Sequence, residues 1–342
     1  MIETVGTYVD RQITIEPHPN GRIAHGVVRE LYAAAREEYG EPLTLRAARL
    51  LDDAVSKDDA VLITTGAGMA PKLPNGEMDG LLGTVGLARA LSLGSEAQTI
   101  VVAEDHIEPP IIGAARAAGL CAASPEVIQD RGSGVAFESI PVEDEPVAAR
   151  LEELFEKYQP AAVVSVEKLG PNELGEIHSG GGENWSDTHA NVAPLFDVAH
   201  ENDVPTVAIG DLGNEIGFGR LADTVREKLP FGDECQCPCE RGNACVTEAD
   251  ALVVASVSNW GASGIQAAMA AVQERPELLH GPDEWKHMYD AAVQHGALDG
   301  PTGYGFGYDD GIPEDAHRGV HLMLNSIVRQ WLRTPENRYY WA

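Results

Sequence analysis

Residues 207–220 read VAIGDLGNEIGFGR, and this stretch decides the kind of fold that the sequence predicts. An apolar run that is typical of a buried strand stops at Gly210, and three more glycines follow within a short loop. Residues 218–230, FGRLADTVREKLP, then have the spacing of an amphipathic helix. A buried strand, a turn and a helix in this order form part of a βαβ unit, so we expect a parallel sheet.

The same alternation of apolar runs and amphipathic helices recurs along the chain. Predicted strands lie at 59–66, 98–105, 134–142, 161–168, 205–211 and 249–259. Predicted helices lie at 25–40, 43–56, 81–94, 109–120, 145–159, 191–203, 218–230, 260–274, 283–295 and 314–333. This pattern indicates an α/β fold, with a largely parallel sheet and helices on both faces in a Rossmann-like three-layer architecture. We expect one large domain over residues 1–342, with its weakest point near 134–146.

The charge balance excludes several classes of partner. The 54 acidic residues outnumber the 24 Lys and Arg residues, which gives a formal net charge of −30. We expect no nucleic-acid partner, because nucleic-acid binding relies on cations that meet phosphates. The acids are spread along the chain, for example in GYDDGIPEDAH at 307–317, and we interpret them as a solvated, halophilic surface of the haloarchaeal type.

The sequence also gives expectations about location. No apolar run approaches the length of a membrane span, so we expect no membrane partner. The first residues, MIETVGTYVDRQITIEPHPNG, lack the basic and then apolar pattern of a signal peptide. We therefore expect a soluble, cytoplasmic protein, and a homo-oligomer is compatible with the sequence.

Polar residues gather in the loops that follow four predicted strands. These are Glu77 and Asp79; Glu167, Asn172 and His178; Asp211, Gly213, Asn214 and Glu215; and Ser258 and Asn259. The carboxyl ends of parallel strands meet at one edge of a sheet, so we expect these loops to form a pocket. The alternative is structural: loop acids often accept backbone hydrogen bonds, and Ser or Asn often caps a helix.

The glycine-rich loop at 210–219 is not a dinucleotide fingerprint. That motif opens a helix with glycines at fixed offsets and places an acid about 20 residues later. Here Asp211 and Glu215 occupy the loop itself and would repel a pyrophosphate. We therefore expect no nucleotide cofactor.

Several motifs resemble the D-glutamate cyclase family. GDLGNEIGFG is similar to the GDGGNE-x-GMG signature of that family, and SNWG at 258–261 resembles its GVSNWGG stretch. NGEMDGLLGTVGLARAL, VSVEKLGPNELG and AAVQHGALDG are similar to further family segments, in the right order over about residues 40 to 330. Lys168, Pro171, Leu174 and Leu212 depart from the residues that the family has at these places.

The resemblance implies a carbon–oxygen lyase that converts D-glutamate to 5-oxo-D-proline and water. The reaction needs a base for the α-ammonium, a proton for the leaving oxygen and neutralisation of the γ-carboxylate. Candidate catalytic residues are Glu77, Asp79, Glu167, His178, Asp211, Glu215 and His295. Candidate substrate-binding residues are Lys168, Asn172, Gly213, Asn214, Ser258 and Asn259. Both histidines also have an ordinary reading as surface or hydrogen-bonded residues.

Two alternatives to this activity stay open. One is a non-catalytic binding or regulatory protein for a small carboxylate, and the other is a lyase or hydrolase that acts on another small amino acid. The density of acids around an anionic substrate suggests a divalent cation, Mg²⁺ or Mn²⁺, with Asp211 and Glu215 as ligands.

Four of the five cysteines lie close together in the sequence. Cys235, Cys237, Cys239 and Cys245 have the spacing C-x-C-x-C-x5-C, which differs from the C-x2-C pairs of common zinc ribbons. Such clustering predicts a soft metal, either Zn²⁺ or an iron–sulfur cluster, with free thiols or a disulfide as the alternatives. Cys121 stands alone and is expected in the core.

Overall fold

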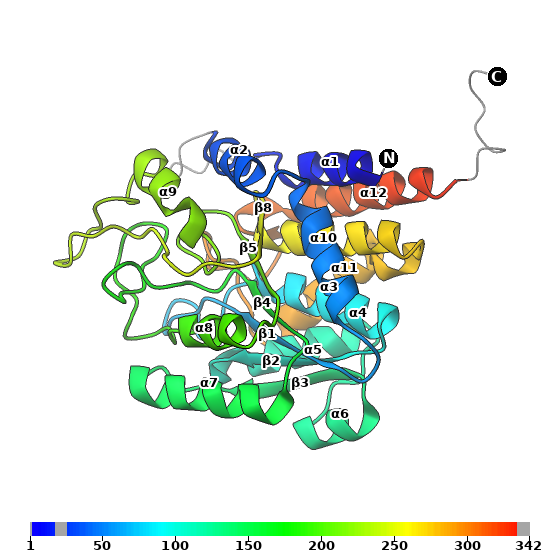
Figure 1. The fold of residues 1–342 in the computed structure, drawn as a ribbon, viewed down its shortest axis with the longest axis horizontal. Helices are drawn as coiled ribbons and strands as arrows, with labels where there is room; N and C mark the ends of the chain where they lie inside the picture. Colours follow the sequence, from blue (N-terminus) through cyan, green and yellow to red (C-terminus); the bar gives the residue numbers. More distant parts are fainter. Residues whose placement is uncertain (1, 18–25, 334–342) are drawn as a thin grey trace.

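A computed structural model describes residues 2–17 and 26–333, and it confirms the predicted α/β fold (Figure 1). Its main sheet has six parallel strands in the order β3-β2-β1-β4-β5-β6. The strands are β1 (Ala60–Thr65), β2 (Gln98–Ala103), β3 (Gly134–Ser139), β4 (Ala162–Val166), β5 (Thr206–Gly210) and β6 (Ala251–Val254). Each lies within a segment that the sequence predicts as a strand.

Helices cover both faces of this sheet. The α-helices are α1 (Ile2–Ile13), α2 (Val27–Tyr39), α3 (Leu43–Ala54), α4 (Leu81–Gly94), α5 (Glu108–Ala117), α6 (Pro125–Arg131), α7 (Asp144–Tyr158), α8 (Ala193–Glu201), α9 (Ala222–Lys228), α10 (Ser258–Val272), α11 (Pro282–Gln294) and α12 (Glu314–Trp331). Figure 1 shows α7 and α8 on one side of the sheet and α3, α4 and α10 on the other. Strands covered on both faces are buried along their whole length, as β1 and β4 are, and this explains why apolar residues dominate both.

Helix α10 lies at the centre of its layer and is buried over almost its whole length. It packs against α1, α3, α4 and α12, and it also contacts the sheet. Gly261 permits this close approach, because a Cβ at that position would lie only 2.5 Å from Ile209 of β5. The start of α10 is therefore held firmly at the carboxyl end of the sheet.

The chain changes direction across the sheet between β1 and β4. Strand β1 pairs with β2 on one side and with β4 on the other, so the loops after β1 and β4 leave the sheet next to each other. Ligands of open α/β sheets bind in the crevice that such a switch point creates. Gly80, with a φ of 78°, brings the first loop against β4, since a Cβ there would lie 2.6 Å from the Cβ of Glu167.

Two helices and one small hairpin within the described residues are absent from the sequence expectations. Helix α1 docks through buried Asp10, whose carboxylate accepts hydrogen bonds from the backbone N–H groups of Leu43 and Thr44 at the start of α3. Helix α6 precedes β3, and a small hairpin joins β7 (Tyr308–Asp309) to β8 (Ile312–Pro313). Asp309 of this hairpin is fully buried, so this one acid of 307–317 is not part of a solvated surface.

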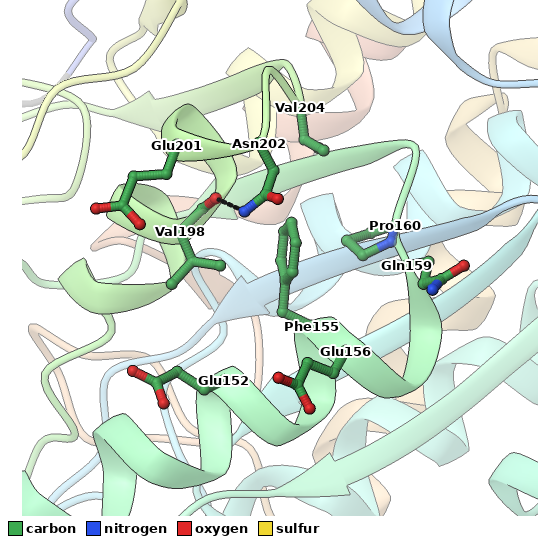
Figure 2. Close-up of a pocket in the computed structure, with 9 residues that line it drawn as sticks. All are labelled: Glu152, Phe155, Glu156, Gln159, Pro160, Val198, Glu201, Asn202 and Val204. Atoms are coloured by element: carbon green, nitrogen blue, oxygen red, sulfur yellow. Dashed lines mark hydrogen bonds between the residues drawn. The ribbon is translucent and has the colours of Figure 1, made fainter.

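A groove between α7 and α8 lies at the opposite edge of the sheet (Figure 2). Its lining includes Pro160 and Val204, which precede the amino ends of β4 and β5, and Phe155 stands between the two helices in Figure 2. The groove is therefore remote from the loops that the sequence predicts as a site. No helix within residues 2–17 and 26–333 has the length and apolar character needed to cross a bilayer.

Candidate functional site

Three carboxylates converge at the switch point of the sheet. Asp79 lies in the loop after β1, Glu167 directly follows β4 and Asp211 directly follows β5. One carboxylate oxygen from each lies within 4.8 Å of the others, and all three side chains are buried. We refer to Asp79, Glu167 and Asp211 as the acidic triad.

Asp79 connects the first loop to the start of α10. Its Oδ1 accepts hydrogen bonds from the backbone N–H groups of Asn259 at 2.7 Å and Gly80 at 2.9 Å, and its Oδ2 accepts one from Ser258 at 3.0 Å. An anionic group at a helix N-terminus is stabilised by the free N–H groups and by the helix dipole. Asp79 therefore has a structural role that also fixes its position in the triad.

Glu167 is held in a conformation that only a few non-glycine residues adopt. Its φ is 57°, in the left-handed region, and the surrounding sheet and helix maintain it there. The Oγ of Ser258 donates a 2.5 Å hydrogen bond to its Oε2. Ser258 thus orients Glu167 through its side chain, while its backbone N–H binds Asp79.

The two acids of the loop after β5, Asp211 and Glu215, have different roles. Glu215 is buried and accepts hydrogen bonds from the backbone N–H groups of Asp211, Leu212 and Gly213, at 3.3, 3.0 and 2.8 Å. The left-handed φ of Gly213, 87°, lets the backbone curl around this carboxylate. Glu215 is therefore the anchor of the loop, and Asp211 is the acid that joins the triad.

Asp211 differs from its neighbours because one of its oxygens has no partner. The side chain is 5% exposed, yet its Oδ1 makes no hydrogen bond, and the buried Oδ1 of Asn214 in the same loop also has none. Buried polar atoms are almost always paired in folded proteins. Two such atoms beside a carboxylate cluster point to a ligand.

Burial raises the pKa of each triad carboxyl well above its ordinary value, and repulsion between carboxylates adds to the effect. The strongest repulsion acts on Asp79 from Asp309, on Glu167 from Glu215 and on Asp211 from Glu167. The pKa of half-buried Glu77 is raised in the same way, by burial and then by Asp79. The group therefore favours protons, a metal cation or an ammonium as its counter-charge.

Lys168 follows Glu167 in the sequence, but its side chain forms an ion pair with a different carboxylate, that of Glu104. It is fully buried, and its Nζ lies 2.5 and 2.7 Å from the two carboxylate oxygens of Glu104 at the end of β2. Glu104 also accepts a hydrogen bond from the N–H of Ala190 at 2.7 Å. Lys168 is thus committed to a structural ion pair, rather than extended towards the triad as a substrate clamp.

A pocket opens beside this ion pair at the same edge of the sheet. Glu104 and His106 line it together with residues that follow β3. Nearby, the Nε2 of His189 accepts a hydrogen bond from the N–H of Gly68 at 3.2 Å. Burial lowers the pKa of His189 to about 4, so its ring is neutral near neutral pH.

Asn259 links the triad region to the β7–β8 hairpin. Its side-chain amide donates to Met78 O at 3.1 Å and to Asp309 Oδ2 at 2.8 Å, and its Oδ1 accepts from the N–H of Gly83 at 2.6 Å. All of its polar atoms are therefore used within the protein. Asn259 acts as a support for the site.

Two other predicted site residues, Asn172 and His295, make hydrogen bonds to the backbone and are not part of the triad. Asn172 closes its own loop, with Oδ1 accepting from Leu174 and Glu176 and Nδ2 donating to Gly242 O. His295 is exposed at the end of α11, and its Nδ1 bonds to Ala291 O at 2.7 Å.

His178 and the cysteines form a second group. The Nε2 of His178 and the thiols of Cys235, Cys237 and Cys239 lie within 4.8 Å of one another. Cys245, which the sequence places in this set, lies outside it: its buried thiol accepts from the N–H of Thr247, and burial raises its pKa to about 12. The set of four is therefore three cysteines and one histidine.

Two residues of the site region are absent from the sequence-based candidates. Glu104 lies near the end of the predicted strand 98–105, in VVAED, so the argument from polar residues at strand ends also applies to it. Asp309 precedes Asp310 and Gly311, and an Asp-Gly pair between extended residues is a hairpin signal. Either signal can be read from the sequence.

Comparison with known proteins agrees with the motif resemblance. The profile of the family described as D-glutamate cyclase-like, C-terminal, matches residues 33–323. Among curated proteins, the chain is similar to the D-glutamate cyclase, mitochondrial, of Homo sapiens, with 26% identity over 189 residues. That match covers 48% of this chain and 29% of the human protein, so it spans less than a third of that relative.

Proposed function

This chain belongs to the D-glutamate cyclase-like family, and on that premise we propose that its acidic triad is the active site of a carbon–oxygen lyase for a small amino acid. The substrate that we propose is D-glutamate, and the products are 5-oxo-D-proline and water. The human relative is named for this activity. The observation that carries the proposal is the unpartnered Oδ1 of buried Asp211, within a group of carboxylates whose charges are not balanced by Lys168.

The donor set of the triad fits a hard divalent cation. Its three ligand atoms are carboxylate oxygens within 4.8 Å of one another, and oxygen-rich sites of this kind suit Mg²⁺ or Mn²⁺. Asp79 and Asp211 would hold the ion, in place of the pair Asp211 and Glu215 that the sequence suggests, which leaves the Glu167 carboxylate beside it free to act as a base. When bound, such an ion polarises a substrate carboxylate and reduces its negative charge.

The reaction makes defined demands on the protein. The α-ammonium loses a proton, the nitrogen attacks the γ-carboxyl carbon, a C–N bond forms, and a C–O bond breaks as the oxygen leaves in water. We assign the first proton transfer to Glu167, because burial raises its pKa and makes its carboxylate a stronger base than an exposed glutamate. Ser258 fixes the orientation of Glu167 for this transfer through the 2.5 Å hydrogen bond.

A second candidate function is non-catalytic binding of a small carboxylate. The observation that favours it is the ion pair of Lys168 with Glu104, which removes the nearest lysine in sequence from contact with a substrate carboxylate. Leu212 also stands where the family signature has glycine. A protein of this kind would bind D-glutamate or 5-oxoproline without converting one to the other.

The two candidates are distinguished by NMR of D-glutamate, L-glutamate and 5-oxoproline in high salt, with and without Mn²⁺. We expect Mn²⁺-dependent conversion of D-glutamate, and Asp211→Asn should reduce it by about 100-fold or more, as loss of a charged catalytic group does. Asp197→Asn, at an exposed position of α8, is the matched control and should retain turnover. Saturable binding without conversion would support the binding protein, and turnover that survives both chelation and Asp211→Asn would refute the metal-dependent proposal.

A further inference from the structure

We infer that His178, Cys235, Cys237 and Cys239 form a site for one zinc ion, separate from the acidic triad. His178 lies in the long loop between β4 and α8, and the three cysteines lie in the loop between α9 and β6. We call these four residues the Cys3His site. Figure 1 shows the two loops, in green and yellow-green, on the side of the molecule where α9 lies.

The distances match the requirements of a single tetrahedral ion. Cys235 Sγ lies 3.3 Å from both Cys237 Sγ and Cys239 Sγ. His178 Nε2 lies 3.3 Å from Cys237 Sγ and 3.5 Å from Cys239 Sγ. Zn–S bonds of about 2.3 Å in a tetrahedron place two sulfurs about 3.8 Å apart, so small shifts would complete the site.

The histidine is already oriented as a ligand. Its Nδ1 lies 3.2 Å from the carbonyl oxygen of Glu176, and a carbonyl can only accept a hydrogen bond, so Nδ1 carries the proton. In the neutral ring, which is the form that binds metal, Nε2 then directs its lone pair at the thiols. A second-shell carbonyl that fixes the histidine tautomer in this way is a regular feature of zinc sites.

Hydrogen-bond donors surround the sulfurs. The backbone N–H of Cys239 donates to Cys237 Sγ at 3.4 Å. The side-chain amides of Asn184 and Asn172 lie 3.9 Å from Cys237 Sγ and 3.8 Å from Cys239 Sγ. Such donors stabilise thiolates, which are the form that binds metal.

The geometry disfavours the other two uses of these cysteines. A disulfide has an S–S bond of about 2.05 Å, whereas all five cysteines of the chain are free. An iron–sulfur cluster places several irons and sulfides between its thiolates, and the compact set of four atoms leaves room for one ion. Four protein ligands of the types Cys and His are typical of structural zinc.

A zinc ion in the Cys3His site would hold together the loop that carries His178 and the loop that carries the three cysteines. It would also stabilise the acidic triad indirectly, through the loop after β5. The loops already share hydrogen bonds, from the N–H of Gln236 to Gly182 O at 2.8 Å and from Asn243 Nδ2 to Ser179 O at 3.1 Å. The carbonyl of His178 also accepts from Asn214 Nδ2 at 2.9 Å, in the loop that carries Asp211. The ion would therefore stabilise the β5 loop without contacting the substrate.

The first test uses the wild-type chain. Elemental analysis after purification with added Zn²⁺ should give one zinc per chain, and Co²⁺ substitution should give the intense visible bands of a tetrahedral thiolate site. X-ray absorption at the zinc edge should fit three sulfurs and one nitrogen. A metal-free chain that binds neither ion, or a disulfide found by mass analysis under non-reducing conditions, would overturn the inference.

Variants then assign the ligands independently of catalysis. Cys237→Ser and His178→Ala should lose the cobalt bands and expose both loops to limited proteolysis, whereas His178→Cys should restore a tetrahedral thiolate spectrum. Cys121→Ser, outside the cluster, is the matched control and should keep the full spectrum. Asp211→Asn should also keep it, so failure of the proposed activity and failure of this site are distinguishable. A wild-type cobalt spectrum that survives both Cys237→Ser and His178→Ala would refute the assignment.

Discussion

Lys168 and Glu104 form a fully buried ion pair that joins the ends of β4 and β2, with Nζ at 2.5 and 2.7 Å from the two carboxylate oxygens. Burial opposes ionisation of Glu104, but attraction to Lys168 outweighs this and lowers its pKa. The pair is a consequence of the position of Lys168 after a buried strand, where a lysine side chain cannot reach solvent.

Lys168→Met should therefore destabilise the protein by about 3–5 kcal/mol, because it leaves the Glu104 carboxylate buried without its counter-charge. Equilibrium unfolding by denaturant measures this change. Lys57 is the control, since its ion pair with Glu96 is exposed, and Lys57→Met should leave stability unchanged. Equal effects of the two substitutions would contradict the structural role of Lys168.

Glu215→Ala should disorder the loop after β5, because Glu215 holds three backbone N–H groups of that loop. Hydrogen bonds to a charged group are worth about 1.5–3 kcal/mol each, so the stability loss should be at least that large. Asp211→Asn removes a repulsive charge instead and should leave stability unchanged or increased. Thermal unfolding of the two variants, with exposed Glu201→Ala as control, tests this opposite pair of effects. A loss of stability in Asp211→Asn comparable to that in Glu215→Ala would show that both acids anchor the loop.

His280 gives a stability term that depends on pH. Burial lowers its pKa to about 3, and its Nδ1 lies 2.7 Å from Gln266 Oε1. In the unfolded chain His280 binds a proton near pH 6.5, whereas in the folded chain it does so only near pH 3. The contribution of neutral His280 to the free energy of unfolding is therefore fully present above pH 6.5 and is lost as the pH falls towards 3. The slope is about 1.4 kcal/mol per pH unit for one group.

His280→Gln should flatten the fall in stability between these pH values relative to the wild type. Exposed His287→Gln is the control and should leave the curve unchanged. Denaturant unfolding at several pH values measures both. Parallel curves for wild type and His280→Gln would mean that His280 takes up its proton at the same pH in the folded and the unfolded chain, which contradicts the lowered pKa.

Salt should stabilise the protein, because a net charge of −30 makes the compact chain repel itself. Raising the salt from about 0.1 M to about 1 M shortens the Debye length from about 10 Å to about 3 Å and screens this repulsion. We expect the melting temperature to rise over that range in both NaCl and KCl. A melting temperature that is constant or falls would contradict the salt-adapted interpretation.

The strands and the edge where the polar loops meet could be predicted because local pattern determines both. A strand buried on two faces is mostly apolar, as β1 is, and parallel strands place their carboxyl ends at one edge. Because residues that follow parallel strands lie at this edge, Asp79, Glu167 and Asp211 could be predicted as site residues. The resemblance in the glycine-rich loop pointed to the family that the profile comparison supports.

The partners of each side chain could not be predicted in the same way. Glu215 and Asp211 have the same charge and lie in one loop, and only the path of the backbone makes one an anchor and leaves the other with a free oxygen. His178 lies with Cys235, Cys237 and Cys239 because the loop after β4 reaches these cysteines, whereas Cys245, which the sequence places with them, is buried in the core. These distinctions depend on contacts between distant segments.

The acidic triad draws its members from three loops far apart in the chain, and this sets when it can form during folding. Loop closure over such separations is costly, so the triad assembles only after β4 and β5 have docked beside β1. A cation held there would therefore slow unfolding while leaving the folding rate nearly unchanged. A bound cation would therefore increase the kinetic stability of the folded sheet by lowering its unfolding rate.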